Sequence, residues 1–186
     1  MKKSDIEEII KNSIPFQFQI GIARNKIDSN RIDGIPLKLG KDLLLIEYLY
    51  DFEFDGYMII RTKDITCVKR SDSEKFSDFI LKKEGIINQI KSPNIVNVDN
   101  FKVIFQELKI LERNIIIECE NIDIGDFYIG KIIKVNNNSV LFLHFDGVGE
   151  WREEPSLIPF KEITSISFDK RYINIMSKYV KPCALQ

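Results

Sequence analysis

Apolar residues recur along this chain with two spacings, one typical of β-strands and the other of α-helices. Helical spacing predicts helices over 4–10, 71–85, 99–112 and 169–179. Residues 28–41 are rich in turn formers, so we expect a long loop there. Alternation and short apolar runs predict strands over 16–23, 42–50, 56–62, 67–69, 115–120, 127–135, 139–146, 149–160 and 165–168.

The predicted helices have recognisable ends and apolar stripes. Ser4 and Glu7 have capping-box spacing, Ser71 or Ser73 caps the second helix, Gly85 ends it, and Asp169 caps the fourth. Each stripe is expected to pack against a core. The stripes are Ile6, Ile9 and Ile10; Phe76, Phe79 and Ile80; Phe101, Ile104, Phe105, Leu108 and Leu111; and Tyr172, Ile175, Met176 and Tyr179.

The two halves of the chain contain similar short segments in the same order. FQIG at 18–21 matches FYIG at 127–130, LLLIEYL matches VLFLHFD, and KDIT at 63–66 matches KEIT at 161–164. This similarity predicts an internal repeat with an insertion near 28–39 in the first copy. We therefore expect one domain over 1–85, a linker over 86–98 and a second domain over 99–186.

The order of elements in each half resembles a known family. A helix, then NIIIECE, FYIGKIIKVNNNSVLFLHFD and IPFKEITSI, is similar to the helix and five strands of the Sm-like, SH3-type small barrels. The resemblance covers 99–168, and more weakly 16–70. It implies an α+β, mainly β protein with two tandem small SH3/Sm-like barrels, each with flanking helices.

The segment DFEFDGYMII at 51–60 imitates the opening of a calcium-binding EF-hand loop. A true loop needs a bidentate glutamate at its twelfth position, which is Thr62 here, and helices on both sides. The flanking segments are strand-like, so we expect a β-hairpin and no calcium site. The alternative is an adventitious cation site or an acidic, aromatic binding surface. With the matching segment FDGVGEWREEP, it gives a candidate partner-binding rim: Asp51, Glu53, Asp55, Tyr57, Glu150, Trp151 and Glu153.

Two residue types occur once and invite a functional hypothesis. His144 lies in a predicted strand, where we expect a partly buried, hydrogen-bonded imidazole. A single histidine cannot build a histidine-rich metal site. Trp151 is expected to fold back over the barrel, with an anchoring role in partner binding as the alternative. Nucleophilic catalysis by Cys67 would need His144 from the other half.

Composition restricts the class of protein. The net charge is −1 and apolar residues make up 44%, which is typical of a soluble globular chain and does not favour nucleic acid as a partner. The N-terminus lacks a signal-peptide core, and the cysteines have no disulfide or metal-ligand spacing, so we expect reduced thiols and a cytoplasmic location. The abundance of Ile, Lys and Asn suggests a bacterial origin. Motifs for nucleotide, metal or serine-hydrolase sites are absent, and we predict no enzyme, no cofactor and no metal.

These observations favour a non-catalytic protein–protein interaction module that binds an unidentified protein, with no DNA and no membrane as partners. The first alternative, implied by the resemblance, is Sm-like binding of single-stranded RNA. KIIKVNNN after Gly130 lacks the family's Asp, IPFKEIT lacks its Arg-Gly, and basic charge is missing. The second alternative is a domain that senses a small molecule.

Overall fold

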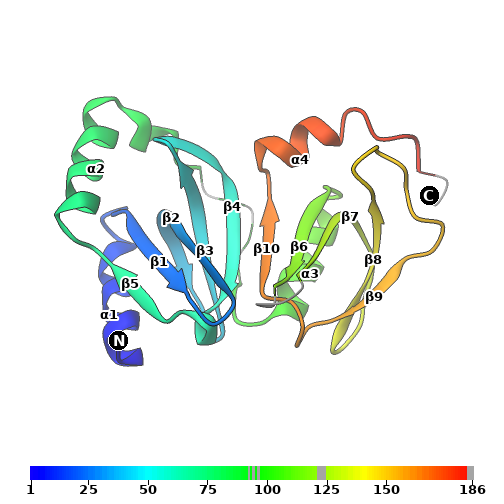
Figure 1. The fold of residues 1–186 in the computed structure, drawn as a ribbon, viewed down its shortest axis with the longest axis horizontal. Helices are drawn as coiled ribbons and strands as arrows, with labels where there is room; N and C mark the ends of the chain where they lie inside the picture. Colours follow the sequence, from blue (N-terminus) through cyan, green and yellow to red (C-terminus); the bar gives the residue numbers. More distant parts are fainter. Residues whose placement is uncertain (92, 94, 96, 121–124, 184–186) are drawn as a thin grey trace.

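The computed structural model describes residues 1–91, 93, 95, 97–120 and 125–183. The first half begins with a helix and continues with five strands and a second helix (Figure 1). Its elements are α1 (Lys3–Ser13), β1 (Ile20–Arg24), β2 (Asp28–Leu39), β3 (Leu43–Tyr50), β4 (Glu53–Arg61), the 3-10 turn η1 (Thr62–Asp64), β5 (Cys67–Lys69), α2 (Asp72–Lys83) and the 3-10 turn η2 (Ile86–Gln89).

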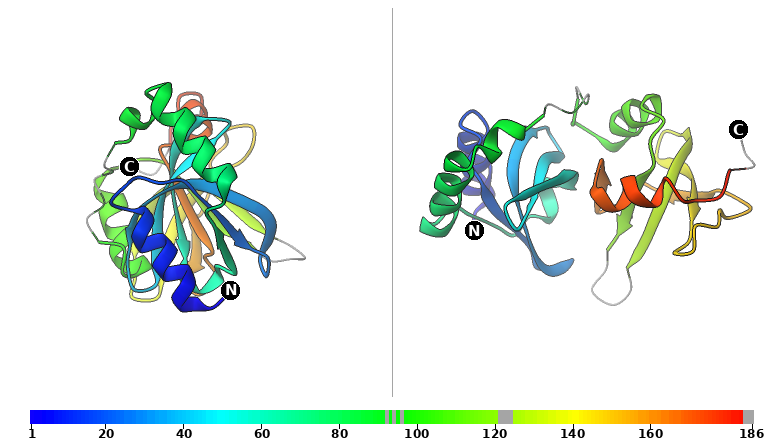
Figure 2. Two further views of the ribbon diagram at one scale, coloured as in Figure 1. Left: turned by 90° about the vertical axis from the view of Figure 1, so that its left-hand side faces the viewer. Right: turned by 90° about the horizontal axis from the view of Figure 1, so that it is seen from above.

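The second half repeats this order of elements. Seen from above, it lies beside the first half, with α1 and α2 at the outer end of the first half (Figure 2). Its elements are α3 (Phe101–Ile110), β6 (Ile115–Cys119), β7 (Asp126–Val135), β8 (Ser139–Phe145), β9 (Ser156–Pro159), β10 (Ser165–Phe168) and α4 (Arg171–Met176).

The ten strands in the described part of the chain form one open antiparallel sheet, in the order β5-β1-β2-β3-β4-β10-β6-β7-β8-β9. The prediction of two tandem small closed barrels is therefore wrong. Strand β4 pairs with β10 of the other half, for example at Ile59 and Ile166, and so does not close a barrel within its own half. The pattern of apolar residues identifies strands but does not say which strand edges meet, which is why the sequence could not reveal this pairing.

The order of strands is nevertheless the same in the two halves, β5-β1-β2-β3-β4 and β10-β6-β7-β8-β9. Gly34 of β2 pairs with Tyr48 of β3, as Gly130 of β7 pairs with His144 of β8. Each of these strand pairs then shifts its register just after the second residue beyond the glycine. A methyl group on either glycine would lie within 3.0 Å of the neighbouring strand's backbone, so both positions need glycine.

This register corrects the alignment expected from sequence. FQIG leads into β1, whereas FYIG lies on β7, and the counterpart of β7 in strand order is β2. Residues 28–39 are therefore neither a loop nor an insertion, because they form β2. Its turn-forming residues are accommodated by the close approach at Gly34 and the register shift after Pro36. The internal repeat itself stays a prediction.

The largest cluster of buried apolar side chains belongs to both halves. It joins Leu45 and Ile59 of the first half to Phe105 and Phe142 of the second. Ile95 and Val98, within the predicted linker, are buried in it as well. The predicted apolar stripe of α3 packs here, which confirms its expected orientation. Burial of these side chains is the main stabilising contribution to the contact between the halves.

A second core lies between α1 and the sheet of the first half. It contains Ile6 and Ile10 of α1 with Ile22 and Ile46 of the strands, so the predicted stripe of α1 is confirmed. The predicted capping box is wrong, since Lys2 is the N-cap and the Ser4 hydroxyl donates to Asp5. In α4 the predicted stripe is wrong for Tyr172, Ile175 and Tyr179, which are exposed, whereas Met176 packs against the cluster that contains the buried Ile173.

Candidate functional site

The β3–β4 hairpin confirms the strand interpretation of the EF-hand-like segment. Tyr50 pairs with Glu53, so Asp51 and Phe52 alone form the turn. Both turn residues are left-handed, with φ of 46° and 64°. Two-residue hairpin turns with two positive φ angles match the twist of the strands and usually contain Asn-Gly or Asp-Gly. Phenylalanine at the second position is unusual and places an aromatic ring at the hairpin tip.

The predicted rim residues of the first half do not share one exposed surface. Tyr57 is only 7% exposed, its hydroxyl donates to the Lys91 carbonyl at 2.8 Å, and its ring stacks on Phe168. Burial raises the pKa of this hydroxyl to about 12. Asp55 accepts the backbone N–H of Arg171 at 2.6 Å. Tyr57 therefore belongs to the core, because position 57 falls on the face of β4 that the second half covers.

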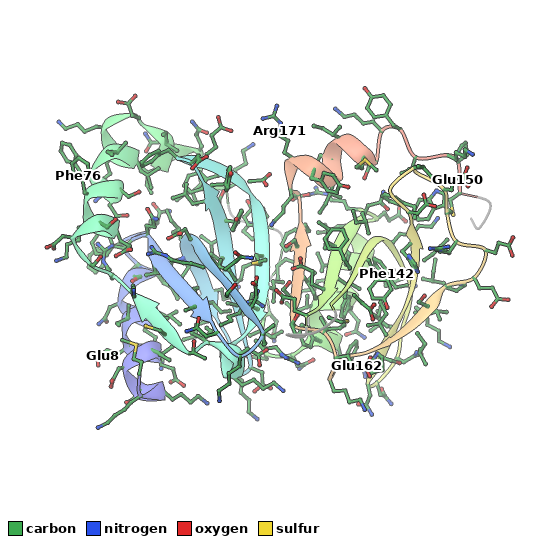
Figure 3. The ribbon with its side chains drawn as sticks, viewed as in Figure 1. Glu8, Phe76, Phe142, Glu150, Glu162 and Arg171 are labelled. Carbon is green, nitrogen blue, oxygen red and sulfur yellow. The ribbon has the colours of Figure 1, made fainter. Side chains whose placement is uncertain are left out.

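The rim residues of the second half are tied to the C-terminal segment. The indole of Trp151 donates to the Lys181 carbonyl at 2.8 Å and packs edge-on against Phe145, so the expected folded-back ring is confirmed. Glu150 pairs with the Lys181 ammonium at 2.5 Å and lies at the outer end of this half (Figure 3). Glu153 is exposed. Three strands separate β4 from β8 in the sheet, so the two groups of rim residues are apart.

Helix α2 presents two phenylalanines to solvent and two of its acids, Glu74 and Asp78, to the protein. Phe76 and Phe79 are 64% and 53% exposed and stack on each other, whereas Glu74 is only 1% exposed. Figure 3 shows Phe76 pointing away from the body of the protein. The expectation that Phe76, Phe79 and Ile80 pack on the core is therefore wrong for the two phenylalanines. Asp78 and Leu81 lie on the buried face with Glu74.

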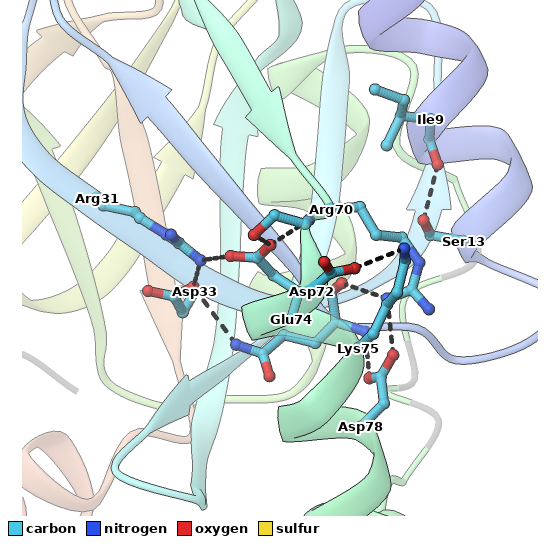
Figure 4. A network of polar contacts seen from close by, with 11 residues as sticks. Ile9, Ser13, Arg31, Asp33, Arg70, Asp72, Glu74, Lys75 and Asp78 are labelled. Atoms are coloured by element: carbon cyan, nitrogen blue, oxygen red, sulfur yellow. Dashed lines mark hydrogen bonds and ion pairs between the residues drawn. The ribbon is translucent and has the colours of Figure 1, made fainter.

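Two arginines from outside the helix explain this orientation (Figure 4). Arg31 of β2 pairs with Glu74 at 2.5 Å, and Arg70 pairs with Asp78 at 2.7 Å. Asp78 also accepts the backbone N–H of Gln19 at 2.8 Å. Charge-assisted bonds of this kind compensate the cost of burying the carboxylates. The inner face of α2 is thus held against the ends of β1 and β2 by ion pairs and hydrogen bonds.

Glu74 also completes the predicted cap of α2. Its carboxylate accepts from the Ser71 hydroxyl and backbone N–H, which confirms Ser71 as the cap in a capping box. Burial favours the neutral acid, but the bonds from Ser71 and Arg31 outweigh it and lower the pKa of Glu74 to about 2. Glu74 is therefore ionised throughout the physiological range.

A pocket of about 370 Å³ lies between α2 and the β3–β4 hairpin. Phe52 and Phe76 border it, and Gln19 and Arg31 line it with the acids Asp33 and Glu74. Gln19 is only 7% exposed, and its Oε1 has no hydrogen-bond partner among the described residues. A buried acceptor without a donor is costly. We name Phe52, Phe76 and Phe79 the aromatic face and the space beside it the Gln19 pocket.

His144 lies at a different pocket, of about 620 Å³, which Glu150, Glu153 and Glu154 also line. Its Nε2 lies 3.1 Å from the Ser156 hydroxyl, and its ring meets Tyr128 edge-on, so the expected partly buried, bonded imidazole is confirmed. Burial, and then the nearby Arg152, lower the pKa of His144. Cys67, on edge strand β5, is remote from β8 and cannot pair with this imidazole.

Glu47 is a buried carboxyl group on the face of β3 that meets the shared core. It pairs across the sheet with Tyr57, and its carboxylate accepts the backbone N–H of Lys91. Its Oε2 has no partner in the described part of the chain. Burial raises the pKa of Glu47 to about 7.

The described residues contain no group of three or more His, Cys, Asp or Glu side chains that could hold a metal ion. Within the same part of the chain, no helix has the length and apolarity needed to cross a membrane.

The sequence of α2 contains one apolar and one acidic stripe, and neither pattern alone shows which of them faces the protein. Phe76 and Phe79 share one side of α2, and Glu74 and Asp78 share the other, so both faces could have been proposed as the inner one. Arg31 decides the choice, and it lies 43 residues from Glu74 along the chain.

Comparison of this chain with protein-family models, with curated proteins and with solved structures found no match.

Proposed function

We propose that this chain is a non-catalytic module that binds another protein, and that the partner docks on the aromatic face. The observation that carries this proposal is the reversed polarity of α2, which holds Phe76 and Phe79 in solvent while Glu74 is buried. Exposed, stacked aromatic rings beside a pocket are typical of surfaces that a partner covers.

The chemistry of the Gln19 pocket defines what the partner inserts. Gln19 lines the pocket that Phe52 and Phe76 border, and its buried Oε1 has no hydrogen-bond partner among the described residues. A side chain with an N–H or O–H donor at the end of an apolar stem would fill the space and satisfy that oxygen. A concave pocket of this size suits one inserted side chain better than a flat membrane surface.

The charges around the aromatic face define the flanks of the partner segment. Lys82 and Lys83 of α2 are exposed, and the Lys83 ammonium lies 5.7 Å from the centre of the Phe79 ring. Carboxylates on either side of the inserted residue would complement these lysines and speed association. The partner is therefore a protein segment with one donor side chain between acidic residues.

A displayed library of random peptides, selected against the protein, tests this proposal. The enriched peptides should share a donor-bearing side chain flanked by Asp or Glu, and their binding should be lost with Phe76→Ser. Tyr172→Ser changes another solvent-exposed aromatic residue, on α4, and is the matched control. Peptides that bind both variants equally would contradict the assignment of the surface. If the protein self-associates and Phe76→Ser abolishes this self-association, the aromatic face instead binds a second copy of the chain.

Two further inferences concern the chain as a whole. We infer that its two halves derive from one duplicated unit, which the common strand order and the paired glycines support. We also infer a cytoplasmic location, with support from the free thiols of Cys67 and Cys119.

A further inference from the structure

A cavity of about 560 Å³ is lined by residues of both halves, at the ends of β3 and β4 opposite the hairpin tip. Leu43 and Arg61, which pair across β3 and β4, form one side. The turn between β7 and β8, the start of α3 and the segment after β9 form the other, through Asn137, Asn138, Asn100, Phe101, Lys102, Phe160 and Lys161.

The cavity is basic, although the chain as a whole carries a net charge of −1. Its cationic lining residues are Lys3, Arg61, Lys63, Lys102 and Lys161, and Asp42 is its one lining carboxylate among the residues that the structure describes. Arg61 is paired with Asp64, and the ammonium of Lys3 lies 3.9 Å from Glu7. The other three lysines have no carboxylate partner among the described residues. An excess of positive charge therefore remains unneutralised at this cavity.

Uncharged hydrogen-bond donors lie at the cavity together with these cations. Helix α3 begins at the cavity, where the Asn100 side chain accepts the Val103 N–H as N-cap and the N–H groups of Phe101 and Lys102 have no intrahelical acceptor. The Lys102 ammonium donates to the Asn137 side-chain oxygen at 2.8 Å, so the amide N–H groups of Asn137 stay available. Ammonium, amide and helix-terminal N–H groups together are what phosphate oxygens require.

An apolar wall completes the cavity. The Phe160 ring lies there and stacks on Phe105 at a centroid distance of 5.5 Å, which fixes its orientation. A planar group could stack beside this ring while anionic groups reach the lysines. The volume of the cavity fits one small ligand rather than a polymer.

We propose that this cavity binds a free nucleotide, with its phosphates among Lys63, Lys102 and Lys161 and its base near Phe160. The site is independent of the aromatic face, because it lies at the other end of β3 and β4. Since both halves contribute to it, a bound nucleotide also links them.

Isothermal titration at low salt with ATP, adenosine, inorganic triphosphate and a single-stranded oligonucleotide tests the proposal. ATP should bind more tightly than adenosine or triphosphate alone, and its affinity should fall as salt rises. Lys161→Glu and Lys63→Glu should each weaken ATP binding by about tenfold. Lys75→Glu and Lys82→Glu on α2 are the matched controls, with the same charge change far from the cavity, and should bind ATP as the parent does.

Three outcomes would overturn the proposal. They are the absence of ATP binding at millimolar concentration, an equal loss in the α2 controls, and binding of the oligonucleotide without binding of ATP. Melting curves of the variants show whether each remains folded. A Phe160→Leu variant, which keeps an apolar wall, should weaken ATP and leave triphosphate binding unchanged. If ATP weakens no more than triphosphate, the base does not lie at this ring.

Discussion

The guanidinium group of Arg31 lies directly over Gly21, at a separation that leaves no room for a side chain on the glycine. Gly21→Ala should push Arg31 aside and break its pairing with Glu74, which is buried. We expect the free energy of unfolding to fall by about 1–3 kcal/mol, because the carboxylate loses a charged partner.

Gly147→Ala is the control for this substitution, since nothing lies within 4 Å of the added methyl group. Its effect should stay within about 0.5 kcal/mol. Urea denaturation of wild type, Gly21→Ala and Gly147→Ala measures the difference in free energy of unfolding. Equal stabilities of the two variants would show that Arg31 does not hold α2 in place.

Glu47→Gln should stabilise the protein at alkaline pH and have little effect in acid. The folded-state pKa of Glu47 is about 7, above the ordinary value of 4.5, so ionisation opposes folding. This penalty begins to appear as pH rises above 4.5 and is complete above about 7. The gain in free energy of unfolding on substitution should therefore grow to as much as about 3 kcal/mol at pH 8.

Urea denaturation of wild type and Glu47→Gln at pH 4.5 and pH 8 measures this dependence. Glu53→Gln, on an exposed position of the same hairpin, is the control and should show no such growth with pH. If Glu47→Gln raises the free energy of unfolding equally at pH 8 and pH 4.5, ionisation of Glu47 does not destabilise the folded protein.

Phe52→Gly should leave stability unchanged or raise it by about 1 kcal/mol, whereas Phe52→Val should lower it. The φ of 64° at Phe52 is readily adopted by glycine and is strongly unfavourable for a β-branched residue. Thermal denaturation gives the order of stability. The glycine variant should also bind partner segments less well, because it removes one ring of the aromatic face. A stable glycine variant with unchanged binding would remove Phe52 from the docking surface.

Phe105→Asp should cost several kcal/mol, because it places an unpaired charge in the core shared by the two halves. Ile110→Asp is the matched control on the same helix, since Ile110 is 79% exposed. It should change the free energy of unfolding by less than about 0.5 kcal/mol. Circular dichroism during urea denaturation follows both variants, and similar curves would contradict the packing of α3.

Local features of this fold could be predicted from sequence where periodicity and end signals agreed. Helix α3 has one continuous apolar stripe, and the β3–β4 hairpin has strand-like segments on both sides of an acidic turn. Strand β2 was missed because its Asp, Asn, Gly and Pro residues favour turns when the neighbouring strand is not known. The ladder with β3 provides the hydrogen bonds that override this local preference.

Features that depend on distant residues could not be predicted. Barrel closure was expected because each half has the strands for it, but the edge of β4 is taken by β10. The reversed face of α2 depends on Arg31 and Arg70, whose positions follow from the fold of β1, β2 and β5. The candidate rim consists mainly of acidic residues, and two of them, Asp55 and Glu150, bond to other residues of the chain. The cavity between the halves collects basic residues that are scattered through the sequence.

The pairing of β4 with β10 also has a consequence for how the protein is made. Ile59 meets Ile166, so about a hundred residues leave the ribosome between the two partners. At about 5–20 residues per second, this interval lasts roughly 5–20 s. During that time β4 has an unpaired edge, and Leu45 and Ile59 have no cover from α3. A nascent first half therefore exposes an unpaired strand edge until β10 has been synthesised, and this edge is open to aggregation during that interval.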